Sequence, residues 1–235
     1  MRAVLFDAGN TLVFLDYARL ANEVGAALQL PLTGEGLRQH EAAATRAMEQ
    51  AAATDQARAA AYLEALFLHG GVPRDRIGEV RDCLGRMHRQ LHLWCTVAEG
   101  VAESLERLRR AGLRLGVVSN SDGRVEEALE AAGLRGYFDV VIDSARVGLE
   151  KPDPRIFYAA LDALGVAPSE ALYVGDLYEV DVAGANAAGI EAVLVTTSAD
   201  DGRRDCRTAR SIEALVNELL PAEAIASNKR EKRTI

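Results

Sequence analysis

Residues 5–12 read LFDAGNTL, and the chain around this stretch decides the fold that we expect. A short apolar run, VLF, is typical of a buried strand, and it stops at the carboxylate of Asp7. Small, flexible or polar residues follow as far as Thr11. The rest of the sequence must therefore explain why a buried strand ends on a carboxylate.

Composition and charge indicate a folded, acidic protein. Of the 235 residues 49% are hydrophobic, which allows one large domain or a core with a smaller companion. The formal net charge of -8 argues against a nucleic-acid-binding protein, because such proteins usually present a basic face to phosphates. We expect small solutes or proteins as partners, with the chain a monomer or a homodimer.

Cysteine usage and hydropathy indicate the compartment. Cys83, Cys95 and Cys206 lie far apart and are odd in number, which is not a disulfide framework and suits a reducing cytosol. No apolar run reaches the length of a membrane span, and the N-terminus lacks the long apolar stretch of a signal peptide. We predict a cytoplasmic protein that binds neither nucleic acid nor membranes.

Short runs of β-branched residues and leucine predict the strands of a sheet. They occupy residues 3–7, 113–120, 137–144, 171–176 and 191–196. Helical patterns that end near a glycine lie between the last four runs. This alternation predicts the α/β class, with a doubly wound, parallel, Rossmann-like sheet covered by helices on both faces.

The connection between the first two strands is far longer than one crossover helix requires. Residues 15–96 lack strand-like runs and are rich in Ala, Leu, Glu and Arg, so they predict an inserted all-α cap domain. Glycine and proline at 30–36 and 70–75 divide it into three or four helices. Residues 1–14 and 97–221 would form the core domain, and the basic segment 222–235 a disordered tail without a function.

Polar groups stand at the carboxyl ends of the predicted strands, where ligands bind in an open parallel sheet. They are Asp7, Ser119, Asn120, Lys151, Asp176 and Asp181. Asp and Asn are also common capping residues, so each group alone is as readily structural as functional. Helix capping does not readily explain why all of these residues follow four successive strand ends.

These groups fit phosphoryl transfer through a covalent carboxylate intermediate. Asp7 would attack phosphorus, and Mg²⁺ between Asp7 and Asp176 would neutralise the charges that repel each other. Lys151 and Ser119 would stabilise the phosphoryl oxygens. Lys151 is informative because the other two lysines of the chain lie in the C-terminal tail.

The motifs DAGNT at 7–11, SN at 119–120, Lys151–Pro152 and GDLYEVD at 175–181 resemble, in this order, the four signature motifs of the haloacid dehalogenase superfamily. With its helical insertion after the first motif, the chain is most similar to the phosphatases and dehalogenases that have a small helical-bundle cap. The resemblance covers the whole chain except the tail. It is specific for the superfamily and says little about the substrate.

The resemblance implies a role for each of these groups in a phosphatase of a small phosphorylated metabolite. Asp7 would be the nucleophile, assisted by Ser119 and Lys151. The phosphate would be bound by Ser119, Asn120 and Lys151. Mg²⁺ would be held by Asp7, Asp176 and the backbone carbonyl of Gly9, with Asp181 as a ligand or a support for the ligands.

Gly9 departs from the pattern of that family. Its phosphatases usually read DxDxT, where the second aspartate protonates the leaving group and later activates water. The backbone carbonyl survives the change to Gly9, but the acid and base are lost. General acid–base catalysis is typically worth about a hundredfold to ten-thousandfold, so we expect a preference for acyl, enol, aryl or anhydride phosphates over sugar phosphates.

The resemblance leaves two other functions open. A 2-haloacid dehalogenase also lacks the second aspartate and works without metal, although the metal-type motif at 175–181 is against it. A weakly active or non-catalytic phospho-ligand-binding protein is the other alternative. Sugar phosphomutases depend on the missing acid and are disfavoured, and phosphonate-cleaving relatives need a cap lysine, which 15–96 does not contain.

Other polar residues allow weaker predictions. His88, His92 and Cys95 share one face at helical spacing and could bind zinc, although no fourth ligand is evident and a packed or solvent-facing histidine pair is the simpler interpretation. Asp122 could touch the ligand, and Asp16 could replace the missing acid. Substrate selection could fall to cap residues, among them Tyr17, Arg19, His40, Arg46 and Trp94.

Overall fold

The computed structural model describes residues 1–51, 54–196 and 206–220. The predicted tail, 222–235, lies outside these residues. Among the helices of the described residues, none is long and apolar enough to cross a membrane.

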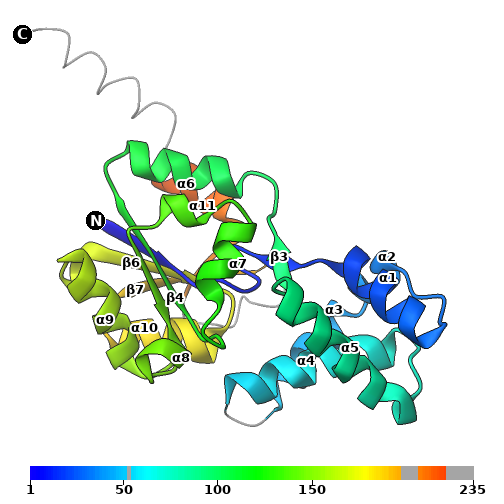
Figure 1. Cartoon of the computed structure of the whole chain (residues 1–235). Coiled ribbons are helices and arrows are strands. Elements are labelled where there is room, and N and C mark those ends of the chain that lie inside the picture. The colour runs from blue at the N-terminus through cyan, green and yellow to red at the C-terminus, as the bar shows by residue number, and fades with distance from the viewer. Residues whose placement is uncertain (52–53, 197–205, 221–235) are drawn as a thin grey trace, which may run out of the picture.

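A parallel sheet forms the centre of the core (Figure 1). Its strands stand in the order β5-β4-β1-β6-β7-β8, and all neighbouring pairs are parallel. The strands are β1 (Ala3–Phe6), β4 (Arg114–Ser119), β5 (Val140–Asp143), β6 (Ala171–Gly175), β7 (Glu191–Val195) and β8 (Arg207–Ala209). The α/β, Rossmann-like fold is confirmed, and β8 at the sheet edge is a strand that the sequence pattern did not predict.

Strand β1 is buried on both faces, which explains its uninterrupted apolar sequence. Val4 and Phe6 belong to one hydrophobic cluster, and Ala3 and Leu5 belong to another. Successive side chains of a strand point to opposite faces, so each cluster lies on its own side of the sheet. The central strand therefore contributes to two cores.

Helices on both faces of the sheet supply the remaining residues of the two hydrophobic clusters. The first cluster includes residues of α6 (Val101–Arg110), α7 (Val125–Ala131) and α11 (Ile212–Leu219). The second includes residues of α9 (Pro154–Leu164) and α10 (Ala183–Ala187). The short helix α8 (Ser144–Val147) follows β5, and a single π-helical turn, Tyr178–Val182, follows β6.

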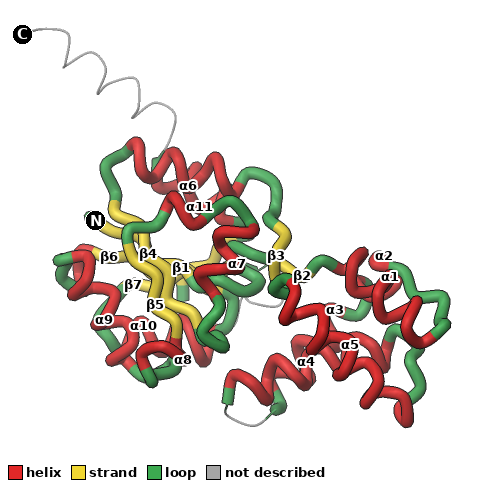
Figure 2. Tube along the Cα trace, in the orientation of Figure 1, coloured by secondary structure: helices red, strands yellow, loops and turns green. Residues whose placement is uncertain are grey.

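The inserted segment is helical and has a hydrophobic cluster of its own (Figure 2). Its helices are α1 (Tyr17–Leu28), α2 (Gly34–Arg38), α3 (Glu41–Glu49), α4 (Asp55–His69) and α5 (Ile77–Gln90). The described residues of this segment thus form five α-helices, one more than the three or four that the sequence predicted. The additional break follows α2 at residues 39–40, where the sequence has neither glycine nor proline.

A short antiparallel ribbon joins the helical segment to the sheet (Figure 1). It consists of β2 (Phe14–Leu15) and β3 (Trp94–Thr96), which lie at the two predicted ends of the cap. The Thr96 hydroxyl donates to the carbonyl oxygen of Phe14 at 2.9 Å and closes the ribbon. Both chain crossings between cap and core therefore run through one narrow connection.

Candidate active site

The polar strand ends meet at the point where the order of the strands reverses. Strand β1 has β4 on one side and β6 on the other, so the carboxyl end of β1 faces the crevice of the doubly wound sheet. Asp7 follows β1, and its N–H still donates to the carbonyl oxygen of Val174 in β6 at 2.8 Å. The backbone ladder thus fixes the place of the Asp7 carboxylate.

Lys151 lies at the centre of a buried cluster of polar groups. Its Nζ donates to Oδ1 of Asp7 at 2.5 Å, to Oδ1 of Asp181 at 2.7 Å and to the hydroxyl of Tyr173 at 3.0 Å. Lys151, Asp7 and Asp181 are 3%, 7% and 1% exposed. One ammonium group therefore links the end of β1 to the turn after β6.

Asp181 is held from several sides. Its Oδ1 accepts a hydrogen bond from Tyr173 at 2.9 Å, and its Oδ2 accepts one from the N–H of Leu177 at 3.0 Å. The carboxylate fits against the strand because residue 175 is glycine, and a Cβ there would overlap it. Asp181 therefore anchors Lys151, with Tyr173 as a third member of the group.

Tyr173 is a site residue that sequence reasoning missed. It lies inside β6 and is completely buried, and its phenol stands between Lys151 and Asp181. The available signal was a hydroxyl-bearing side chain in an otherwise apolar buried strand, since a buried tyrosine hydroxyl usually has a partner. The partner could not be identified without knowing which strands adjoin β6.

Asn120 positions the loop that carries Lys151. Its Nδ2 donates to the carbonyl oxygen of Lys151 at 3.0 Å, and its Oδ1 accepts from the N–H of Lys151 at 2.7 Å. Both ends of the side-chain amide are thus used by the backbone. The contact of Asn120 with a phosphate stays a prediction, for which its backbone N–H and the second hydrogen on Nδ2 are the donors.

Ser119 ends β4 beside these groups and is 4% exposed. Its hydroxyl lies 3.4 Å from the carbonyl oxygen of Asn120, at the far limit of a hydrogen bond. A hydroxyl held this weakly can rotate towards an incoming oxyanion.

Three carboxylates share this region with the single ammonium group of Lys151. Oxygens of Asp7, Asp176 and Asp181 lie within 4.8 Å of one another. Burial raises the pKa of Asp7 to about 7, although Lys151 opposes the shift. Withdrawal from solvent and the charges of Asp7 and Asp181 hold the pKa of Asp176 well above its ordinary value. One ammonium group thus does not compensate three ionised carboxylates, and the site takes up protons when no cation is bound.

Lys151 stays protonated in this cluster. Burial by itself would lower the pKa of its ammonium group, but the carboxylates of Asp181 and Asp7 outweigh burial and raise it. The site thus holds a permanent positive charge next to the Asp7 carboxylate.

A cavity of about 650 Å³ opens over these groups, between the core and the helical segment. Core residues on its wall include Asp7, Ser119, Lys151 and Asp176. The helical segment contributes, among others, Asp55, Arg58, Tyr62, His88, His92 and Trp94. Of the five cap residues that the sequence suggested for substrate selection, Trp94 is the one on this wall.

Other sequence-predicted residues have partners within the helical segment. Asp16 accepts a hydrogen bond from the N–H of Arg19 at 2.9 Å and caps α1, which explains its place without a catalytic task. The Arg19 guanidinium donates to the carbonyl oxygen of Met87 at 3.0 Å, and Tyr17 shares a hydrogen bond of 2.9 Å with the Tyr62 hydroxyl.

Trp94 lies over Gly9, the position of the missing acid. A Cβ at Gly9 would lie 3.8 Å from Cδ1 and Nε1 of the indole, which is ordinary contact. The indole N–H donates to Oδ1 of Asn10 at 3.1 Å. A side chain at position 9 would therefore fit, and it would point towards the tryptophan.

The model of the haloacid dehalogenase-like hydrolase family matches residues 1–189. The chain belongs to this family. A relative of nearly the same extent is ribulose-1,5-bisphosphate 5-phosphatase of Halopiger xanaduensis, which is 32% identical over 231 residues and is aligned over 91% of this chain and 95% of its own.

Other members of the haloacid dehalogenase-like family match more closely over a shorter stretch. Haloacid dehalogenase-like hydrolase domain-containing protein 3 of Mus musculus is 44% identical over 128 residues, or 54% of this chain. That stretch spans about half of the mouse protein, 51% of its length. A solved structure of a dehalogenase is 27% identical, with a TM-score of 0.63 over 94% of this chain and 97% of its own. The relatives thus include a named phosphatase and a named dehalogenase.

Proposed function

We propose that this member of the family is a Mg²⁺-dependent phosphatase that transfers the phosphoryl group of a small phosphorylated metabolite to Asp7 and then to water. The observation that carries the proposal is the charge of the cluster, three carboxylates against one lysine. Attack on a phosphate brings further negative charge to such a site, and a divalent cation offsets both. The phosphatase of Halopiger xanaduensis supports the same reaction class.

The residues of the cluster fit Mg²⁺ because their donors are all oxygen and the carboxylates outnumber the single ammonium group. Asp7 and Asp176 would hold the ion, together with the backbone carbonyl of Gly9. When bound, it would neutralise the nucleophile and the phosphoryl oxygens that otherwise repel it. Asp181 would support this arrangement from behind through Lys151 and Tyr173.

In the proposed reaction an oxygen of Asp7 forms the bond to phosphorus as the bond to the leaving oxygen breaks. The ammonium group of Lys151 and the hydroxyl of Ser119 stabilise the charge that spreads over the phosphoryl oxygens. Water then attacks the phosphorus of the aspartyl phosphate, and inorganic phosphate leaves with Asp7 restored. The tight bond between Lys151 and Asp7, 2.5 Å, supports this sharing of charge at the nucleophile.

Gly9 supports a restriction on the substrate. No carboxylic acid is available at this position to protonate the leaving oxygen, and the indole of Trp94 lies over it instead. Leaving groups that need no proton should therefore react faster than alkoxides. Acyl and aryl phosphates are the expected good substrates.

The test is phosphate release from acetyl phosphate and p-nitrophenyl phosphate by the full chain, with Mg²⁺ and with EDTA. Turnover that needs Mg²⁺ and disappears in Asp7→Asn supports the proposal. Absence of turnover of either compound at high enzyme concentration would favour a non-catalytic phospho-ligand-binding protein.

A dehalogenase is the second candidate, favoured by the 27% identity to the solved dehalogenase structure. In that reaction the Asp7 carboxylate would attack carbon and displace the halide, with no need for a cation. Chloride release from a 2-chloro acid in EDTA would establish this function and overturn the phosphatase. The three-carboxylate cluster is the reason to place the phosphatase first.

A further inference from the structure

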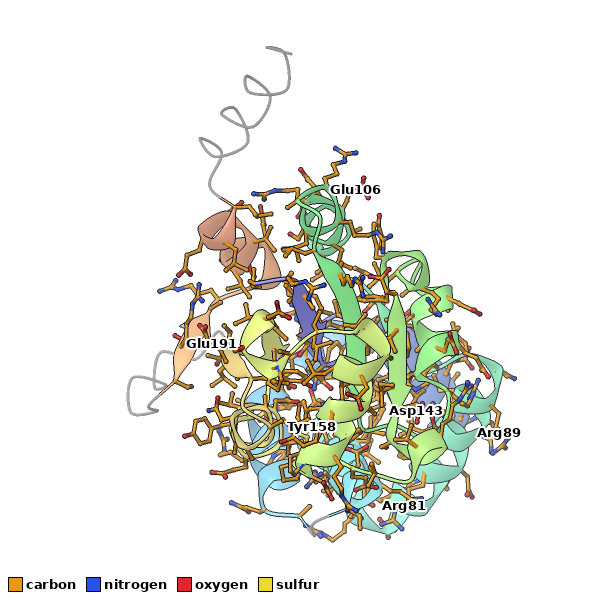
Figure 3. The ribbon with its side chains drawn as sticks, turned by 90° about the vertical axis from the view of Figure 1, so that its left-hand side faces the viewer. Arg81, Arg89, Glu106, Asp143, Tyr158 and Glu191 are labelled. Atoms are coloured by element: carbon orange, nitrogen blue, oxygen red, sulfur yellow. The ribbon has the colours of Figure 1, made fainter. Side chains whose placement is uncertain are left out.

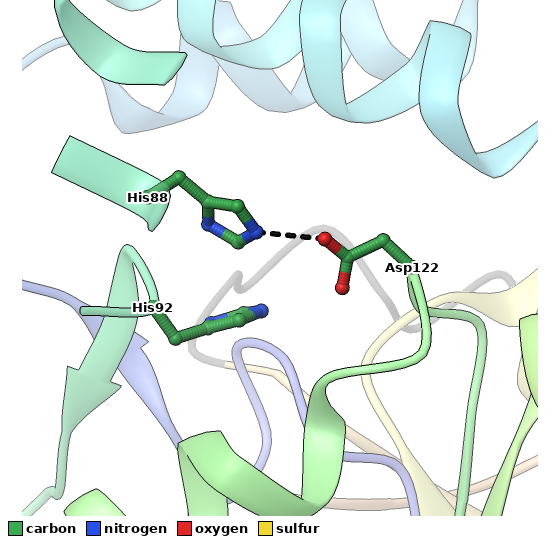
Figure 4. Close-up of side chains that lie close together, drawn as sticks. All are labelled: His88, His92 and Asp122. Atoms are coloured by element: carbon green, nitrogen blue, oxygen red, sulfur yellow. Dashed lines mark hydrogen bonds and ion pairs between the residues drawn. The ribbon is translucent and has the colours of Figure 1, made fainter. Parts of the chain in front are cut away.

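Two histidines of the helical segment and an aspartate of the core come together at the cavity (Figure 4). His88 lies near the end of α5, His92 lies between α5 and β3, and Asp122 lies in the loop between β4 and α7. Each offers one ligand atom, and these atoms lie within 4.8 Å of one another. Nε2 of His88 and Oδ2 of Asp122 are already 2.8 Å apart.

Cys95, which the sequence grouped with the two histidines, belongs to another environment. Burial raises the pKa of its thiol, and Arg19 and Asp16 are the charged groups beside it. The third member of the group is instead Asp122, which lies thirty residues after His92 in the sequence. The sequence spacing had suggested Cys95 for this position.

The imidazole of His92 is held in an orientation suited to binding a metal. Its Nδ1 lies 3.1 Å from the carbonyl oxygen of Trp94 and 3.2 Å from the backbone nitrogen of the same residue, and its ring lies 4.5 Å from that of His88, centroid to centroid. In the tautomer with the proton on Nδ1, this nitrogen donates to the carbonyl, which is the usual support of a metal-bound histidine and leaves Nε2 as the ligand. In the other tautomer, Nδ1 accepts from the Trp94 N–H instead. In Figure 4 the ring of His92 extends towards Asp122.

Asp143, which is labelled in Figure 3, is the last residue of β5. It fixes the loop that carries Asp122. The buried carboxylate of Asp143 accepts hydrogen bonds from the N–H groups of Gly123 and Val125, at 3.0 and 3.1 Å. The Asp122 backbone is therefore held in place while its own carboxylate stays exposed.

The charges around the three residues are compatible with a cation. The hydrogen bond and the charge of His88 keep the pKa of Asp122 below its ordinary value against the opposing effect of burial, so the carboxylate is ionised. Burial and the nearby His88 lower the pKa of His92, so its imidazole is neutral at neutral pH. Arg124 is the opposing charge, and it is paired with Glu127 at 2.9 Å.

We propose that Nε2 of His88, Nε2 of His92 and an oxygen of Asp122 bind a transition-metal ion of the zinc type that links the helical segment to the core. Two imidazoles and one carboxylate are a usual three-ligand set for zinc, with water as the fourth ligand. The oxygen-only cluster at Asp7 suits a harder cation, so the two sites select different metals.

Binding requires a change of tautomer at His88. The proton that lies between Nε2 and Asp122 leaves this nitrogen to the metal and moves to Nδ1, so the imidazole stays neutral. Nδ1 of His88 faces the N–H of Leu93 at 3.4 Å, and this long hydrogen bond is the contact that is given up. Metal affinity should fall at acid pH, because protons compete with the metal for the ring nitrogens.

The test of binding is a titration of the full chain with Co²⁺ in excess Mg²⁺, which keeps the oxygen-only cluster supplied with the harder ion. We expect one Co²⁺ per chain, visible absorption bands of a nitrogen-ligated site, and their loss when Zn²⁺ is added. Trp94, the single tryptophan of the chain, lies 6.2 Å from His92 by ring centroids, so Co²⁺ should also quench its fluorescence.

Matched variants locate the site. Asp122→Asn, which keeps the shape and the hydrogen bond to His88, should weaken Co²⁺ binding at least about tenfold, as should His88→Gln. Cys95→Ser and His69→Gln should bind as the natural chain does. Thermal unfolding without metal checks that each variant is folded, and Zn²⁺ should raise the melting temperature of the natural chain more than that of Asp122→Asn.

No cobalt spectrum in the natural chain would overturn the proposal, as would equal binding by Asp122→Asn and His88→Gln. Loss of binding in Cys95→Ser would also overturn it and point to a thiolate ligand. The inference does not rest on the proposed phosphatase, because every readout is binding or stability, so either proposal can fail without the other.

Discussion

The two clusters at the cavity are built in different ways. The cluster of Asp7, Lys151 and Asp181 is assembled from segments that follow the strands of one sheet, and it is buried. The cluster of His88, His92 and Asp122 joins two parts of the chain that the β2–β3 ribbon connects, and Asp122 is exposed. The first is fixed by folding itself, whereas the second depends on how the helical segment lies against the core.

The comparison predicts which substitutions matter for folding and which matter for function alone. Changes in the buried cluster should alter both stability and chemistry. Changes in the cluster across the cavity should leave stability nearly unchanged when no metal is present.

The largest effect is expected for Asp7→Asn. The amide cannot form the covalent intermediate, so phosphate release should fall on the order of a thousandfold or more. The measurement is Mg²⁺-dependent turnover of acetyl phosphate. Ser121→Ala, on a neighbouring loop of the cavity, is the control and should retain most of the activity. Turnover by Asp7→Asn near the natural rate would remove Asp7 from the mechanism.

Lys151→Met should destabilise the metal-free protein by about 3–5 kcal/mol, because it leaves buried carboxylates without their partner. Denaturant unfolding measures the change. Arg155→Met, the loss of a pair on the surface, is the matched control and should leave the free energy of unfolding nearly unchanged. Equal losses of unfolding free energy in the two variants would contradict the prediction that the buried cluster contributes more to stability than a surface ion pair.

Gly9→Asp should raise the turnover of alkyl phosphates by up to about a hundredfold and that of acyl phosphates much less. The new carboxyl group has room beside Trp94, since its Cβ would lie 3.8 Å from the indole. Turnover of an alkyl phosphate and of acetyl phosphate, measured in parallel, gives the ratio. Equal gains on both substrates, or none, would show that the missing acid does not limit the reaction.

Asp7 should make the stability of the metal-free protein depend on pH. Burial raises its pKa from 3.8 to about 7, so between these values the unfolded chain is ionised while the folded site holds a proton. Its contribution to stability is therefore greatest at acid pH and is lost as the pH rises towards 7. Relative to Asp7→Asn in EDTA, the melting temperature of the natural chain should fall across this range. A constant difference between the two would contradict the shifted pKa.

The smallest effect on stability is expected for Asp122→Asn, in the cluster of His88, His92 and Asp122. The Asp122 side chain is half exposed, and exposed ion pairs typically contribute less than about 1 kcal/mol. Asp122→Asn should therefore leave the free energy of unfolding of the metal-free protein almost unchanged. A loss as large as that of Lys151→Met would erase the distinction between the two clusters.

Much of the sheet was predictable because its signals are local. A strand buried on both faces, such as β1, is a continuous apolar run, and a polar residue at its end is visible in the sequence itself. The same kind of reading located Ser119 at the end of β4 and Asp176 directly after β6. The break between α2 and α3 was missed because neither glycine nor proline marks it.

The sequence by itself determined the α/β class, the helical insertion and the set of polar strand ends that includes Asp7 and Lys151. Only the tertiary structure decided that Tyr173 joins Lys151 to Asp181, that Asn120 holds the Lys151 backbone, and that Asp122 meets His88 and His92. Periodicity and turn residues report the conformation of a few neighbouring positions. Contacts between distant residues depend on strand order and on the angle of the helical segment, and these are set by the packing of whole elements.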